Sequence, residues 1–189
     1  MLYNIYMRVV LASNSPRRKE LLAEILPNFE IIPSFAPEIT TEKEPRKVVM
    51  ELAEHKATDV WNKNRDALVI GCDTVVNLDG KVLGKPQDAL DATNMLNCLS
   101  GKTHFVHTGV CVLWKDEKRA FCETTAVTFR QLSQKEIANY VSCGAPMDKA
   151  GAYGIQECDF VSEFCGSYNN VMGLPTEQLK KVLQNLYKR

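Results

Sequence analysis

The stretch ALVIGC at residues 67–72, followed at once by Asp73 and Thr74, decides the fold of this chain. A continuous apolar run of this length is typical of a central strand that is covered on both faces. The run predicts that Asp73 lies at the carboxyl end of that strand. In open α/β sheets ligands collect at such ends, where a carboxylate can hold a metal or orient water. The alternative is an aspartate that ends a strand and bonds the next turn.

A second apolar run, residues 9–12, leads through the polar turn Ser13-Asn14-Ser15 into a helical pattern. Ser15 suits the N-cap of that helix and Pro16 suits its first position. The apolar spacing continues until Pro27, which is expected to stop the helix. The sequence therefore predicts a strand, a polar turn and a helix in direct succession.

The polar turn has the chemistry of an anion site. A helix amino terminus offers N–H groups that have no partner inside the helix, and Arg17 and Arg18 add forked cationic donors. Such a turn is suited to holding phosphate. A capped surface helix with solvated arginines is the alternative interpretation of the same residues.

The rest of the chain alternates between helical and strand patterns. Helices are predicted from Pro45, from about Asp88 to Leu99, from Ser133 to about Ser142 and after Pro175, with strands near 104–114, 120–130 and 160–164 and a hairpin turn at 78–81. The pattern contains no repeat and no linker. It predicts one mixed α/β domain over residues 1–189, in which helices flank a twisted sheet in two lobes around a central cleft. Such a cleft is the natural place for a ligand.

Composition excludes several classes of function. Lysine and arginine number 23, as do aspartate and glutamate, so the formal net charge is zero and no basic field exists for general binding to nucleic acid or acidic membrane. No segment approaches the roughly 18 consecutive apolar residues of a membrane helix. Arg8 interrupts the apolar opening, which therefore does not match a signal peptide. The seven cysteines form no C-x-x-C pair, and we expect reduced thiols, mostly buried, in the cytoplasm.

Three lysines stand beside glycine, proline or apolar residues and not in a solvated charge run: Lys56, Lys85 and Lys149. They could converge on phosphates, although a surface lysine whose stem packs on apolar neighbours is the alternative for each one. A P-loop ATPase is excluded, because Leu96 stands where the loop before Gly101-Lys102-Thr103 requires glycine.

Six blocks of sequence follow one another at compatible spacing: LASNSPRRKELL at 11–22, GCDTVV at 71–76, LGKP at 83–86, LSGKTH at 99–104, DKAGAYGIQ at 148–156 and NNVMGLP at 169–175. Together they closely resemble the Maf family of nucleoside triphosphate pyrophosphatases. The resemblance runs from about residue 8 to the last helix and leaves residues 1–6 as an extension. It implies a fold similar to that of inosine triphosphate pyrophosphatase.

The resemblance also implies roles for individual residues. Asp73 would accept the proton of the attacking water in a reaction assisted by a divalent metal, Mg²⁺ or Mn²⁺, with Glu38 and Asp73 as metal ligands. The positions expected to discriminate between substrates are Arg17, Thr74 and Gln156. The positions expected to take phosphate or metal roles are Ser13, Arg18, Glu38, Lys56 and Lys85. Cys72 replaces the alanine or serine of many relatives, a small change.

Within the family, the DKAGAYGIQ block and Thr74 resemble the branch that acts on dTTP and UTP. The implied reaction is hydrolysis of these pyrimidine nucleotides, and of modified ones, to the monophosphate and pyrophosphate. Two alternatives stay open: a pyrophosphatase for 7-methyl-GTP or a broader set of nucleotides, and a regulatory binding protein of septum formation. The resemblance alone suggests a homodimer. No nucleic-acid or membrane partner is expected.

Overall fold

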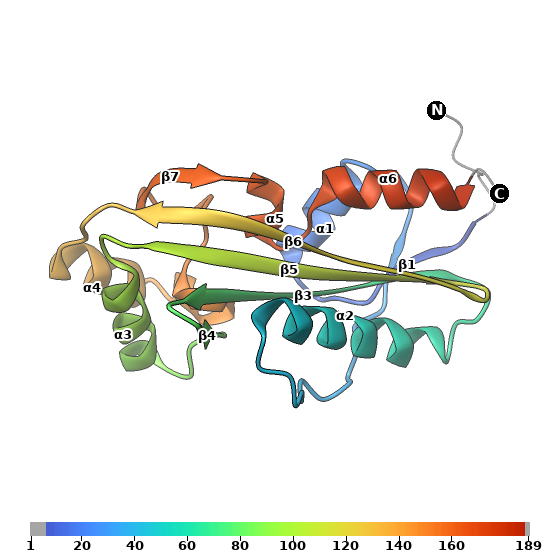
Figure 1. Ribbon diagram of the computed structural model, residues 1–189, viewed down its shortest axis with the longest axis horizontal. Coiled ribbons are helices and arrows are strands. Elements are labelled where there is room, and N and C mark those ends of the chain that lie inside the picture. Colours follow the sequence, from blue (N-terminus) through green and yellow to red (C-terminus); the bar gives the residue numbers. More distant parts are fainter. Residues whose placement is uncertain (1–6, 188–189) are drawn as a thin grey trace. The chain divides into compact units, whose positions relative to one another are not determined.

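The computed structural model describes residues 7–187 and divides the chain into two compact units. The first unit takes in the chain up to Asp73, Thr108–Glu123 and the chain from Gly173, and the second takes in Thr74–His107 and Thr124–Met172. The elements follow one another as β1 (Val9–Leu11), α1 (Pro16–Ala23), β2 (Glu30–Ile31), α2 (Pro45–Trp61), β3 (Leu68–Leu78), β4 (Lys81–Leu83), α3 (Ala89–Leu99), β5 (Thr103–Trp114), β6 (Glu117–Phe129), α4 (Gln134–Ser142), β7 (Val161–Cys165), α5 (Tyr168–Met172) and α6 (Thr176–Tyr187) (Figure 1).

The strands of the described residues form one seven-stranded sheet in the order β2-β1-β3-β5-β6-β7, with β4 also paired to β3. Strand β1 runs parallel to β2 and to β3, whereas β4 and β7 run antiparallel to their partners. Parallel and antiparallel pairs therefore share one sheet, and the prediction of a mixed α/β fold with flanking helices is confirmed. Strands β3, β5 and β6 each contribute residues to both units.

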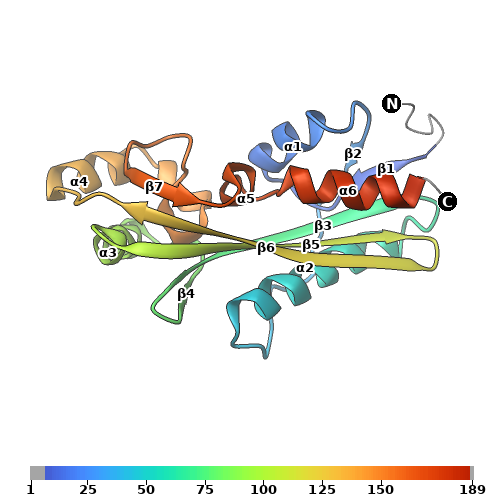
Figure 2. The same cartoon turned by 45° about the horizontal axis from the view of Figure 1, so that its top comes forward.

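The first unit packs its helices on both faces of the sheet. Figures 1 and 2 show α1 and α6 over one face and α2 over the other. Helix α2 lies close to the strands because two glycines face it. A Cβ added at Gly71 would come within 2.3 Å of the Ala53 carbonyl oxygen, and one at Gly109 within 2.3 Å of the Val49 carbonyl oxygen. Only hydrogen fits at these two positions, so the helix backbone rests directly on β3 and β5.

The second unit has an aromatic core of its own. The Phe129 ring makes edge contacts with His104 at 4.9 Å, with Tyr153 at 4.7 Å and with Phe160 at 5.8 Å between ring centroids. The imidazole of His104 is fully buried, and burial lowers its pKa to about 4. The ring is therefore a neutral core group that accepts or donates one hydrogen bond, at 2.8 Å, with the Tyr153 hydroxyl.

Caps and turns follow the sequence closely. The hydroxyl of Ser15 accepts the Arg18 N–H at the start of α1, and Ser133 forms a capping box with Glu136 at the start of α4. The hairpin between β3 and β4 has positive φ at both central residues, Asp79 at 52° and Gly80 at 83°, as this tight turn requires. These local predictions are confirmed.

Three predictions of local structure are wrong. Helix α1 ends at Ala23, before Pro27, because Leu22 already accepts the closing hydrogen bonds from Glu24 and Leu26. The Gly-Ser-Tyr-Asn-Asn sequence at 166–170 predicts a turn, but the segment contains the start of the short helix α5. The cysteines are not mostly buried: the three exposed ones are Cys98, Cys143 and Cys165. The expectation of free thiols holds for all seven.

Candidate active site

Asp73 is a buried carboxylate within strand β3. The expectation that it ends the strand is wrong: β3 continues to Leu78, because its later residues pair with β4. The parallel pairing with β1 does end earlier, at Ile70, so β1 has already left the sheet where Asp73 stands. The residue is 7% exposed. Burial raises the pKa of its carboxyl above the ordinary value, while the positive charges of Lys56 and Arg18 act in the opposite direction.

Lys56 joins Asp73 to a second carboxylate. The lysine lies on α2, and its Nζ donates to Asp73 Oδ1 at 2.6 Å and lies 2.6 Å from Glu38 Oε1. Its side chain is 14% exposed, against 55% for that of Glu38. The close approach of α2 to β3 at Gly71 brings the lysine to the aspartate. One ammonium thus holds a buried carboxylate and a solvent-facing one together.

The loop that carries Glu38 is fastened to α2 on both sides. Asp59 accepts hydrogen bonds from the Ser34 hydroxyl and the Phe35 N–H, each at 2.9 Å, and Thr40 donates its hydroxyl to Glu51. The bonds from the Phe35 N–H and the Ser34 hydroxyl lower the pKa of Asp59 below its ordinary value. The same helix therefore positions Lys56 and the loop that brings Glu38 to it.

The turn before α1 meets the Asp73 segment through Arg18. Its Nε donates to the Gly173 carbonyl at 2.9 Å, and its Nη1 donates to the Cys72 carbonyl at 2.9 Å and to Ser13 Oγ at 3.2 Å. Ser13 Oγ also accepts the Ser15 N–H at 3.3 Å. The hydroxyl of Ser13 thus acts as an acceptor in both of these bonds and keeps its own proton to donate. Arg18 fixes the turn beside β3.

The neighbouring thiol of Cys72 takes no part in this chemistry. It is fully buried, and burial raises its pKa to about 11. A thiol in such surroundings stays protonated at neutral pH and is a poor nucleophile.

The two carboxylates fit a divalent cation that also binds phosphate. Glu38 and Asp73 each direct one oxygen at the same positive charge, that of Lys56. Among residues 7–187 no group of three or more histidine, cysteine, aspartate or glutamate side chains could hold a metal ion. Mg²⁺ commonly uses one or two carboxylates and completes its shell with water and substrate phosphates. This donor set therefore suits a divalent cation whose shell is completed by water and phosphate oxygens.

Three other predicted site residues, Thr74, Lys85 and Gln156, belong to the second unit. Thr74 is half-buried on β3, and Lys85 and Gln156 are exposed. Within that unit the segments of Lys85 and Gln156 are joined, because the Gly151 N–H donates to the Gly84 carbonyl at 2.9 Å. Arg17 is half-buried in the first unit.

Lys149, which could have contacted phosphate, instead forms contacts within its own segment. It is buried, and its ammonium lies 2.7 Å from Asp148 Oδ1, 2.9 Å from Glu157 Oε2 and 2.5 Å from the Ala145 carbonyl oxygen. An ammonium has three N–H donors, and these three acceptors use them all. Lys149 therefore holds its own segment together and has no donor left for phosphate. Glu157 follows Gln156 directly and carries no sequence signal of its own, since its role depends on this contact with Lys149.

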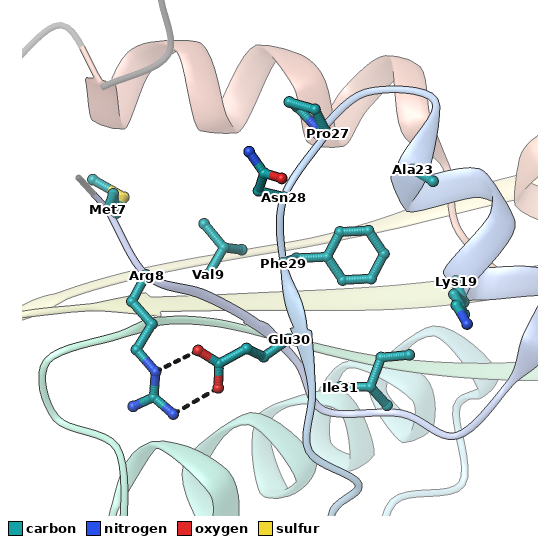
Figure 3. A pocket seen from close by; sticks show the side chains of 10 residues that line it. All are labelled: Met7, Arg8, Val9, Lys19, Ala23, Pro27, Asn28, Phe29, Glu30 and Ile31. Atoms are coloured by element: carbon teal, nitrogen blue, oxygen red, sulfur yellow. Dashed lines mark hydrogen bonds and ion pairs between the residues drawn. The ribbon is translucent and has the colours of Figure 1, made fainter. Parts of the chain in front are cut away.

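A hollow of about 600 Å³ lies elsewhere in the first unit (Figure 3). Its lining residues are Met7, Arg8, Val9, Lys19, Ala23, Pro27, Asn28, Phe29, Glu30 and Ile31. Figure 3 shows Arg8 and Glu30 facing one another, with both guanidinium contacts at 2.8 Å. None of the predicted site residues lines this hollow, and two of its charged residues, Arg8 and Glu30, pair with each other.

No helix within the described part of the chain has the length and apolar character needed to cross a membrane.

Comparison with known proteins gives one consistent family. The family model described as Maf-like protein matches residues 8–186. The dTTP/UTP pyrophosphatase of Aquifex aeolicus is 45% identical over 182 residues, which cover 95% of this chain and 96% of that protein. The dTTP/UTP pyrophosphatase of Thermococcus kodakarensis is 45% identical over 177 residues, covering 92% and 94%. The structure of the Staphylococcus aureus Ham1 protein aligns with a TM-score of 0.49 at 16% identity, covering 95% of this chain and 99% of that one. This similarity is too distant to define the fold, so the fold class is assigned from the strand order of this chain.

Proposed function

We propose that this chain, which belongs to the Maf family, hydrolyses dTTP and UTP to the nucleoside monophosphate and pyrophosphate. The observation that carries the proposal is the buried Asp73 carboxylate, held 2.6 Å from the Lys56 ammonium beside the turn of Ser13 and Arg18. Relatives of nearly equal length and 45% identity are named for this activity.

The charges suit a polyphosphate. A nucleoside triphosphate carries about four negative charges, and its hydrolysis moves further charge onto the departing pyrophosphate. The amino terminus of α1, the hydroxyl proton of Ser13 and the cations Arg17, Arg18 and Lys56 supply donors and positive charge in the first unit. Lys85, which the family resemblance implicates in phosphate binding, is an exposed cation of the second unit.

Asp73 is proposed to take the proton of the attacking water. An exposed aspartate has a pKa near 3.9 and is a weak base, whereas burial raises the pKa of this one. The positive charge of Lys56 lowers the pKa of this carboxyl in opposition to burial, and its hydrogen bond fixes the direction of Oδ1. The oxygen of water forms a bond to the phosphorus of the α-phosphate, and a proton of that water passes to Asp73. The anhydride bond between the α- and β-phosphates breaks, and pyrophosphate leaves.

Glu38 and Asp73 are proposed to hold a divalent cation, Mg²⁺ or Mn²⁺. When bound, the cation supplies positive charge that neutralises the phosphates. The cation requirement has a direct test. Glu38→Gln removes one charged ligand, so the concentration of Mg²⁺ that gives half-maximal pyrophosphate release should rise severalfold. The same titration on Glu42→Gln, an exposed glutamate of the same loop, is the control. An unchanged requirement in Glu38→Gln would remove this residue from the cation site.

Several further roles belong to the same proposal. Arg17, Thr74 and Gln156 are proposed to discriminate between nucleotides. The family match spans segments of both units, which supports one functional domain over residues 1–189. Seven free thiols are consistent with an enzyme of the reducing cytoplasm. A homodimer is proposed from the family resemblance alone.

The central experiment compares wild type with Asp73→Asn, which keeps the shape of the side chain and removes its charge. Pyrophosphate release is measured with dTTP, UTP, CTP, the purine triphosphates and 7-methyl-GTP. Wild type should prefer dTTP and UTP, and the variant should lose at least about a hundredfold in kcat/KM, as expected for a lost general base. Asp116→Asn, at an exposed turn of the same unit, is the matched control and should stay active. Near-normal turnover by Asp73→Asn would refute the proposal.

A further inference from the structure

The second unit contains a chain of polar contacts that ends at Gln156. Lys149, saturated by its three acceptors, lies 2.9 Å from Glu157 Oε2. The other carboxylate oxygen, Glu157 Oε1, accepts a hydrogen bond from Gln156 Nε2 at 3.0 Å. Glu157 thus joins a buried cation to an exposed amide with one oxygen for each. Through Glu157, the exposed Gln156 side chain is therefore connected to the buried Lys149 of the same unit.

This contact decides which end of the Gln156 amide faces outward. A carboxylate can only accept hydrogen bonds, so the group that faces Glu157 must be the NH₂ and not the carbonyl. Among the residues that the structure describes, the side chain that bonds to the Gln156 amide is that of Glu157. The amide oxygen, Oε1, therefore remains for a ligand, and Gln156 presents an acceptor.

Gly154 leaves the space that this arrangement needs. A Cβ at this position would lie 2.8 Å from Lys149 Cε and 3.2 Å from Gln156 Nε2. The lysine stem and the glutamine amide thus pass the backbone of Gly154 at close range. This second observation is independent of the hydrogen bonds and fixes the same two side chains.

Building on the proposed function, we propose that Glu157 is a positioning residue that orients Gln156 to select uracil and thymine over cytosine. Uracil and thymine carry a donor at ring position N3, an N–H, whereas cytosine carries an unprotonated acceptor nitrogen there. An amide oxygen held outward matches the former bases and meets the lone pair of the latter. A site built to hydrogen-bond a substrate N–H discriminates strongly against an analogue that lacks it.

Glu157→Gln tests the orientation itself. The new amide at position 157 has one acceptor, which the Lys149 ammonium takes, so its NH₂ faces Gln156. The Gln156 amide must then turn its own oxygen inward and its NH₂ toward the base. We expect the ratio of kcat/KM for UTP to that for CTP to fall by at least about tenfold, as for one lost hydrogen bond, with dTTP following UTP.

Glu163→Gln is the matched control, because Glu163 is an exposed glutamate of the same unit. A merely structural role of Glu157 would lower activity on all nucleotides together and leave the ratio unchanged, and that result would overturn the inference. If wild type itself does not hydrolyse dTTP or UTP, the proposed function fails as well; if wild type does and the ratio is unchanged, the inference alone fails.

Gly154→Ala gives a second route should Glu157→Gln not fold. The added methyl group collides with Lys149 and displaces the Gln156 amide without changing any charge. The ratio of UTP to CTP hydrolysis should fall here too, by several-fold, in protein whose cooperative unfolding by urea confirms that it is folded. An unchanged ratio in such protein would count against the inference in the same way.

Discussion

Replacing Lys56 with methionine should destabilise the protein in a way that depends on pH. Methionine keeps most of the apolar stem of lysine and removes the ammonium, which lies 2.6 Å from Asp73 Oδ1 and from Glu38 Oε1. Glu38 is more than half exposed, so the loss of that contact contributes only about 0 to 1 kcal/mol. Most of the loss of stability should therefore come from the broken contact with the buried carboxylate of Asp73.

The magnitude follows from the burial of Asp73. Breaking a buried ion pair by removing one partner costs about 3 to 5 kcal/mol, and the lower end applies here because the carboxyl can take up a proton and Arg18 remains nearby. A loss of about 3 kcal/mol corresponds to a fall in Tm of roughly 6 to 12 °C for a chain of this length. That is a large part of the free energy of unfolding of an ordinary domain.

The sign of the pH dependence is fixed by the direction of the pKa shift. Asp73 has a raised pKa in the folded protein, and without Lys56 the pKa rises further, because one of the influences that lower it is gone. A carboxyl with a raised folded pKa favours folding while it is protonated and loses that contribution as the pH rises through the folded pKa. The variant should therefore lie close to wild type near pH 5 and fall well below it near pH 8.

Urea unfolding of both proteins at the two pH values, in buffer without divalent metal, measures this difference. Lys47→Met, at an exposed position of the same helix, is the control and should change stability little. Equal destabilisation of Lys56→Met at pH 5 and pH 8 would refute the reasoning, because it would mean that packing of the stem, and not the charge, is what Lys56 contributes.

Three further predictions concern the packing of α2, the contacts of Arg18 and the burial of the cysteines. Gly71→Ala should lower the free energy of unfolding by about 1 to 3 kcal/mol in urea, whereas Gly84→Ala, whose Cβ would meet nothing within 4 Å, should be close to neutral. Arg18→Lys should lower both stability and kcat/KM for UTP, because an ammonium cannot span the three acceptors that the guanidinium reaches; full activity would contradict this. A thiol reagent at neutral pH should label the exposed cysteines quickly, but Cys72 and Cys111 only after unfolding, since burial raises their pKa values to about 11 and about 12; rapid labelling of all seven would contradict the burial.

Much of the site was predictable because its signals are local. The N-cap at Ser15, the proline after it and the apolar run before Asp73 each depend on neighbours within a few residues, and the structure places them as expected. The predicted end of β3 is wrong, because the apolar run alone does not mark where the strand ends. Asp73 follows that run, but pairing with β4 across the hairpin turn at Asp79 extends the strand beyond it. The hairpin partner thus overrides the apparent strand end.

The contacts that give charges their roles depend on distant parts of the chain. Lys56 and Lys149 look alike in sequence, each beside small or apolar residues. Lys56 lies between two carboxylates at the candidate site. Lys149 instead donates all three N–H groups, to Asp148, Glu157 and a backbone carbonyl. Periodicity and composition do not distinguish these two situations, because both depend on which loops the fold brings to the ammonium.

The two glycines under helix α2 limit how such an enzyme could be altered in the laboratory. Every replacement at Gly71 or Gly109 pushes the helix away from the strands, and the helix carries the lysine that must reach Asp73. Random libraries spread over residues 45–73 and 108–110 would therefore yield mostly dead clones at these two sites, whatever activity is selected. Diversity aimed at a new nucleotide preference is better concentrated in the segment around Gln156, where the side chain is exposed and is held by a hydrogen bond to Glu157.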